Sequence, residues 1–111
     1  MKVSHESYED VTVVAVKGEI TLDEISPLKQ LLDEQLARDA RDFVLDLTEV
    51  PFIDSAGLES MLWLQDQAGE KLGQVRIVGP DENVRKILEI TRLQHDFDAH
   101  EDIDSAIKSL R

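Results

Sequence analysis

A carboxylate and a hydroxyl stand side by side at Asp54 and Ser55, between two apolar stretches of the chain. The stretch before them has the continuous apolar character of a strand covered on both faces, and the stretch after them repeats apolar residues at helical spacing. Ser55 therefore lies at a helix N-terminus, on the sheet edge where ligands and partners dock in open parallel sheets. Its position fits two roles, a helix cap or a site that other proteins can reach.

A capping role is common for a serine at such a position, but here Asp54 can already cap the helix. The small residues Ala56 and Gly57 follow directly, and they would let the backbone or active site of a partner approach closely. We therefore treat Ser55 as the candidate site and the plain cap as the alternative.

The sequence disfavours nucleophilic catalysis and metal binding. Ser55 lacks the preceding glycine of a nucleophile elbow, and none of the three histidines has positional support as its base. His95 and His100 are five residues apart, so on a strand their side chains would point to opposite faces and would not converge on a metal ion. The chain has no cysteine, and we expect a protein without catalytic residues, bound metal or cofactor.

The elements that must position Ser55 alternate between strand and helix. The strand before it is predicted over residues 43–47, and β-branched residues predict another strand over 11–16. A weaker strand near residues 3–7 would pair with the latter as an antiparallel hairpin. The helix after Ser55 is expected to bury a stripe formed by Leu58, Met61, Leu62, Gln65, Ala68 and Leu72.

An amphipathic helix is predicted between the hairpin and the central strand, with an apolar face of Ile25, Leu28, Leu31, Leu32 and Leu36. We expect Ser26 to be its N-cap, Pro27 its first residue, and Arg41 to lie near its end. A start a few residues earlier, capped by Thr21 or Asp23, is the alternative.

The C-terminal part continues the same alternation. A short strand is predicted over residues 75–78, followed by a helix that Asp81 caps and whose stripe is Val84, Ile87, Leu88 and Thr91. Phe97 should return to the core beside a possible further strand, and Asp102 can cap a last short helix. The pattern predicts one α/β domain over residues 1–111, with a small mixed sheet, an antiparallel edge hairpin and about four helices.

The composition narrows the classes of partner. The formal net charge is −12, and the basic residues are scattered along the chain. Because binding to nucleic acid or an anionic membrane needs concentrated positive charge, we expect neither direct nucleic-acid binding nor membrane insertion. No apolar stretch is long enough to span a bilayer, and the N-terminus lacks an apolar signal core, which together predict a cytoplasmic protein.

Helical spacing also suggests a docking face. Steps of four residues from Ser55 reach Glu59 and then Trp63, which would place a hydroxyl, a carboxylate and an indole in a row. Trp63 is then either an interface anchor or a residue packed under a neighbouring helix, and the sequence supports both interpretations equally.

The segment from Phe43 to Leu58 resembles the signature of STAS domains, in particular the bacterial anti-sigma factor antagonists. The segment Val16–Ile20 resembles the opening strand and Gly-Glu turn of that family, and Val84–Leu93 resembles its third helix. The match covers nearly the whole chain, and its order agrees with the elements predicted above. The resemblance therefore implies a STAS-like fold.

In that family, the serine after the aspartate is phosphorylated by a partner that is both kinase and anti-sigma factor, and a serine phosphatase restores it. The resemblance implies that Ser55 is the phosphoacceptor, that the unmodified form binds the anti-sigma factor and releases a sigma factor, and that the modified form does not bind. Together with the helical spacing, it places the partner-binding surface on Thr21, Asp54, Ser55, Ala56, Gly57, Glu59 and Trp63.

Three positions depart from the family pattern. Ala56 stands where a second Ser or Thr is frequent, Glu59 replaces a common glycine, and Thr21 takes a place that aspartate often holds. These departures motivate an alternative function, a STAS subunit that binds a partner permanently in a bacterial lipid-transport complex.

Overall fold

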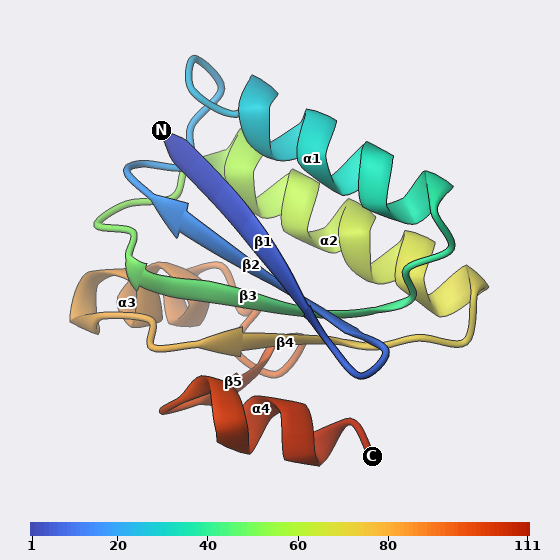
Figure 1. The fold of residues 1–111 in the computed structure, drawn as a ribbon. Helices are drawn as coiled ribbons and strands as arrows, with labels where there is room; N and C mark the ends of the chain where they lie inside the picture. The colour runs from blue at the N-terminus through green and yellow to red at the C-terminus, as the bar shows by residue number, and fades with distance from the viewer.

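Five strands form one mixed sheet in the order β1-β2-β3-β4-β5 in the computed structural model, which describes all of residues 1–111 (Figure 1). The first two strands are antiparallel and the remaining neighbours are parallel. Their bounds are β1 Lys2–Tyr8, β2 Val11–Lys17, β3 Asp42–Glu49, β4 Val75–Val78 and β5 Asp98–His100. The predicted mixed sheet, its edge hairpin and the possible last strand are thus confirmed.

Four helices cover the two faces of this sheet. They are α1 Ser26–Ala37, α2 Ser55–Glu70, α3 Glu82–Ile90 and α4 Ile103–Ser109. Figure 1 shows α1 and α2 side by side on one face and α4 on the other. Buried residues of α1, α2 and α3 share the larger core, whereas α4 covers a smaller core on the opposite face.

The central strand β3 is buried on both faces, as its continuous apolar run predicts. Phe43 and Leu45 belong to the larger core, while Val44 between them belongs to the smaller one. Parallel pairing with β2 and β4 on either side fixes the direction of the strand. Its carboxyl end leads through residues 50–54 to the start of α2.

Aspartates cap three of the four helices, as the sequence predicts. The side chain of Asp54 accepts a hydrogen bond from the Gly57 N–H, and Asp81 and Asp102 do the same for the N–H groups of Val84 and Ser105. Each bond satisfies one of the N–H groups that the first helical turn leaves without an intrahelical partner.

The predicted bounds of α1 are wrong at both ends. Ile25, not Ser26, occupies the N-cap position and makes no side-chain cap hydrogen bond, so Pro27 is the second helical residue. The Ile25 side chain is buried, and its packing replaces a polar cap. The helix ends at Ala37 rather than near Arg41, because Asp39 adopts a left-handed conformation with φ of 65°.

Two residues expected on buried helical stripes lie outside their helices. Leu72 follows the end of α2, has φ of 63° and is 88% exposed. Thr91 is the C-cap of α3, is exposed, and its hydroxyl donates to the backbone oxygen of Ile87. In both cases the helix stops before the apolar periodicity does.

None of the helices combines the length and the hydrophobicity that crossing a bilayer requires.

Candidate functional site

The carboxylate of Asp54 joins two loops at the carboxyl end of the sheet. Its Oδ1 accepts the Gly57 N–H at 2.9 Å, and its Oδ2 accepts the Leu22 N–H at 3.0 Å. The Asp54 N–H in turn donates to the Ile20 backbone oxygen at 3.2 Å. The two bonds from Gly57 and Leu22 stabilise the ionised form, so they hold the pKa of Asp54 below its ordinary value.

The loop between β2 and α1 is tied to the loop between β3 and α2. Ile20 and Ile53 form an isolated parallel bridge, and the Ile20 N–H donates to the Phe52 oxygen at 3.0 Å. This bridge extends the pairing of β2 and β3 beyond the ends of both strands. It fixes Thr21 and Leu22 beside the start of α2.

Gly57 makes this close approach possible. A Cβ at this position would lie 2.3 Å from the backbone oxygen of Ile20 and 2.7 Å from Cγ2 of Ile53. Gly57 is itself buried. Gly57 therefore lets the Ile20 loop pack against the first turn of α2, while the residues on either side of it in the helix form the surface.

Ser55 is the first residue of α2 and its side chain is exposed. Because Asp54 is the N-cap, the Ser55 hydroxyl is not required for capping. The helix N-terminus concentrates backbone N–H groups and the positive end of the helix dipole at this point, an environment favourable for negative charge. The hydroxyl is free for modification or for contact with a partner.

A groove of 480 Å³ runs between α1 and α2 next to Ser55. From α2 it is lined by Ala56, Glu59, Ser60 and Trp63, and from the other side by Leu22, Ile25, Lys29 and Asp33. Trp63 is half-buried and packs against the larger core, so part of the indole is structural and part lines the groove. The structure thus supports both interpretations of this tryptophan in part.

The seven predicted surface residues lie on the loop between β2 and α1 and on residues 54–63, from the N-cap to the middle of α2, with different exposure. Ser55 and Glu59 are exposed; Thr21, Asp54, Ala56 and Trp63 are half-buried; and Gly57 is buried. Glu59 and Trp63 share the groove as the helical spacing predicts, whereas Ser55 lies outside its lining.

Two apolar side chains of this surface were missed by the sequence reasoning. Leu22 is 71% exposed and Phe52 is 40% exposed, although the chain has few large apolar side chains in solvent. They lie on the two loops that Asp54 and the Ile20–Ile53 bridge hold together. The sequence signal for Leu22 is an apolar residue inside a polar loop segment, which is typical of an exposed binding contact.

A family model described as "STAS domain" matches residues 2–106 of this chain. The chain belongs to the STAS domain family. One solved structure to which it is similar is that of an anti-sigma factor antagonist from Mycobacterium paratuberculosis. That STAS structure superposes with a TM-score of 0.87 at 26% identity, covering 99% of this chain and 93% of the other.

This STAS domain is also similar to two further proteins. The phosphorylated form of SpoIIAA, a cell fate determinant of Bacillus, has the same fold, with a TM-score of 0.76 at 16% identity over 99% of this chain and 100% of the other. The STAS-domain containing protein PA14_20770 of Pseudomonas aeruginosa (strain UCBPP-PA14) is 34% identical over 64 residues. That alignment covers 58% of this chain and 63% of the Pseudomonas protein.

Proposed function

We propose that this STAS domain is an anti-sigma factor antagonist whose partner binding is switched off by phosphorylation of Ser55. The observation that carries the proposal is the exposed Ser55 hydroxyl at the start of α2, next to an aspartate that already serves as the N-cap. Structures of anti-sigma factor antagonists that share the fold support the family assignment, and one of them is a phosphorylated form.

The site can accept a phosphate without unfolding. A phosphate on Ser55 would add about −1.5 to −2 charges at the first position of α2, where the helix dipole and the first-turn N–H groups favour negative charge. Asp54 would remain bound to Gly57 and Leu22, because neither bond uses the serine. The fold and the modification are therefore compatible.

A partner packed over the same spot would lose its contact. The phosphate would stand beside two carboxylates, those of Asp54 and Glu59, and a bulky solvated dianion would have to be buried in the interface. A loss of about 3 kcal/mol of binding free energy weakens a complex more than a hundredfold. The switch then acts by local disruption and needs no conformational change.

The partners that this function requires are an anti-sigma factor with serine kinase activity and a serine phosphatase, acting in the cytoplasm. The antagonist itself acts as a binding protein and not as an enzyme. Leu22 and Phe52 supply exposed apolar contacts around Ser55, and the half-buried indole of Trp63 supplies an aromatic wall to the groove. The acidic chain, with its net charge of −12, would attract a partner with a basic surface.

Mapping the phosphorylation site tests the proposal. The protein is incubated with ATP and the cognate kinase, and its peptides are sequenced by mass spectrometry beside Ser55→Ala. We expect phosphate on Ser55 and none on the variant. Phosphate found only at other positions overturns the proposal. Co-purification of a partner equally by wild type and Ser55→Glu also overturns it and favours a constitutive assembly subunit.

A further inference from the structure

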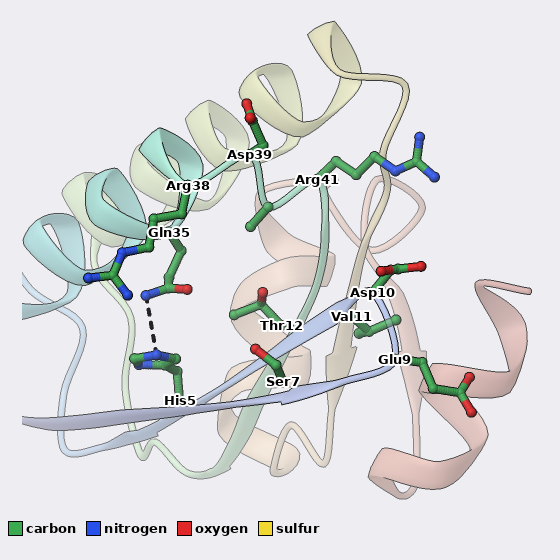
Figure 2. A pocket seen from close by; sticks show the side chains of 11 residues that line it. His5, Ser7, Glu9, Asp10, Val11, Thr12, Gln35, Arg38, Asp39 and Arg41 are labelled. Atoms are coloured by element: carbon green, nitrogen blue, oxygen red, sulfur yellow. Dashed lines mark hydrogen bonds between the residues drawn. The ribbon is translucent and has the colours of Figure 1, made fainter.

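A polar cavity of 570 Å³ opens beside the turn of the β1–β2 hairpin (Figure 2). We name it the hairpin cavity, and its lining includes the polar residues His5, Thr12 and Gln35 and the charged residues Glu9, Asp10, Arg38, Asp39 and Arg41. The C-terminal end of α1 and the loop to β3 form its other side. Its volume is within the range of small-molecule sites, which is roughly 300–1,000 Å³.

Two of the three buried polar side chains of the protein open onto this cavity. Thr12 is 5% exposed and Gln35 is 7% exposed, and both line the hairpin cavity. The Thr12 hydroxyl takes part in no side-chain hydrogen bond of the protein. The Thr12 hydroxyl is not among the buried side-chain atoms that lack a partner, so it is accessible from the cavity and a bound molecule can hydrogen-bond to it.

The Gln35 side chain is held with one end free. Its Nε2 lies 3.2 Å from Nε2 of His5, and Figure 2 shows the two side chains pointing toward each other at the lining of the cavity. The amide nitrogen is a donor, so the imidazole nitrogen accepts and the amide oxygen Oε1 is left without a partner. The lining therefore offers the amide oxygen of Gln35 as an acceptor in the same cavity as the Thr12 hydroxyl.

The unpaired charges around the hairpin cavity are mainly positive. Neither Arg38 nor Arg41 forms a salt bridge. Of the three carboxylates on the lining, Glu9 pairs with Arg111 and Asp39 pairs with Lys71 at 3.4 Å, which leaves Asp10 unpaired. The lining as a whole thus holds three carboxylates and two guanidinium groups, and both guanidinium groups but only one carboxylate are without a salt bridge.

In Figure 2, Arg38 extends on the same side of the cavity as Gln35 and His5, whereas Arg41 extends on the other side. A guanidinium group binds carboxylate and phosphate through two parallel hydrogen bonds. Arg38 can therefore hold an anionic group at one end of a ligand while Thr12 and Gln35 bind hydroxyl groups of the same ligand.

We propose that the hairpin cavity is a binding site for a small hydroxylated organic anion, a polyol phosphate or a hydroxy acid. The anionic group pairs with Arg38, a ligand hydroxyl donates to Oε1 of Gln35, and another bonds the Thr12 hydroxyl. The site is separate from Ser55, because the cavity lies at the C-terminal end of α1 and the start of β2, whereas Ser55 begins α2 after the carboxyl end of β3 (Figure 1). This proposal therefore stands or falls independently of the phosphorylation switch.

The test is an NMR titration of the full chain labelled with ¹⁵N, using glycerol 3-phosphate as the phosphate probe and malate as the carboxylate probe. Glycerol and sodium chloride of equal ionic strength serve as controls. We expect one anion to give saturable shifts at Thr12 and at the side-chain amide of Gln35 at about 10 mM, where a site of millimolar affinity is mostly occupied. Which probe saturates decides between the two ligand types.

Variants distinguish specific binding in the cavity from nonspecific attraction of anions to positive charge. Arg38→Gln and Thr12→Val should each lower the affinity for the saturating probe about tenfold, equivalent to about 1.4 kcal/mol of binding free energy. Lys86→Gln, which removes the same charge from an exposed position on α3, should leave affinity unchanged. Absence of saturation by both anions, shifts equal to those with sodium chloride, or unchanged affinity in Arg38→Gln would overturn the proposal.

Discussion

Oδ2 of Asp54 accepts the backbone N–H of Leu22 at 3.0 Å across a sequence separation of 32 residues. The other oxygen of the same carboxylate caps α2 by accepting the Gly57 N–H. One side chain thus joins the loop before α1 to the first turn of α2, and the exposed Leu22 and Ser55 side chains are held at one end of the molecule. The surface proposed for partner binding depends on this carboxylate.

Replacing Asp54 by asparagine should loosen that surface. Asparagine keeps one acceptor oxygen for the cap but presents an NH₂ group where Leu22 needs an acceptor. We expect a lower unfolding midpoint and faster hydrogen exchange at the Leu22 amide. Asp81→Asn is the matched control, because Asp81 caps α3 through the Val84 N–H at 2.8 Å and holds no second loop. Equal effects of the two variants on Leu22 exchange would contradict this role.

The same contacts predict a dependence on pH. Because they lower the pKa of Asp54 in the folded protein, the unfolded chain binds the proton more readily. The contribution of Asp54 to stability is therefore complete above about pH 4, the ordinary carboxyl range, and is lost as the pH falls through the lower folded pKa. Urea unfolding at several pH values should show the difference between wild type and Asp54→Asn shrinking only below that range. A difference that grows on acidification would reverse the sign and exclude the explanation.

Gly57 and Gly69 lie in the same helix and should respond oppositely to alanine. At Gly57 the new Cβ would meet the Ile20 oxygen at 2.3 Å, whereas at Gly69 it would have no neighbour within 4 Å. We expect Gly57→Ala to reduce the free energy of unfolding by about 3 kcal/mol through overpacking. Gly69→Ala should increase it by about 0.5 kcal/mol through helix propensity. Chemical denaturation measures both, and a neutral Gly57→Ala would show that the two loops are not in tight contact.

The sequence predicts the topology and the three aspartate caps because both depend on local patterns, such as the apolar run 43–47 and the Asp54 side chain beside a helix start. It does not predict where helices end. Leu72 and Asp39 adopt left-handed conformations that propensity assigns to glycine, and the packing after each helix decides those positions. Leu22 was missed for a related reason, since its place in the site depends on a hydrogen bond to a residue distant in sequence.

The exposed apolar residues around Ser55 should contribute to partner binding. Leu22→Ser and Phe52→Ser each remove an exposed apolar side chain, and we expect either change to weaken partner affinity by about tenfold, with little change in stability for Leu22→Ser, whose side chain is 71% exposed. Leu72→Ser is the control, because Leu72 is 88% exposed and lies beyond the far end of α2. Calorimetric titration with the purified partner gives the affinities. A loss in Leu72→Ser equal to that in Leu22→Ser would remove the case for this surface.

The most direct test measures the affinity of the partner for two forms of the same protein, unmodified and phosphorylated on Ser55, together with their thermal unfolding midpoints. We predict at least a hundredfold weaker binding for the phosphorylated form, about 2.7 kcal/mol or more. The unfolding midpoints should stay similar, because the phosphate lies at a helix N-terminus. Equal affinities of the two forms would contradict the switch, and a collapse of the midpoint would contradict local disruption as its mechanism.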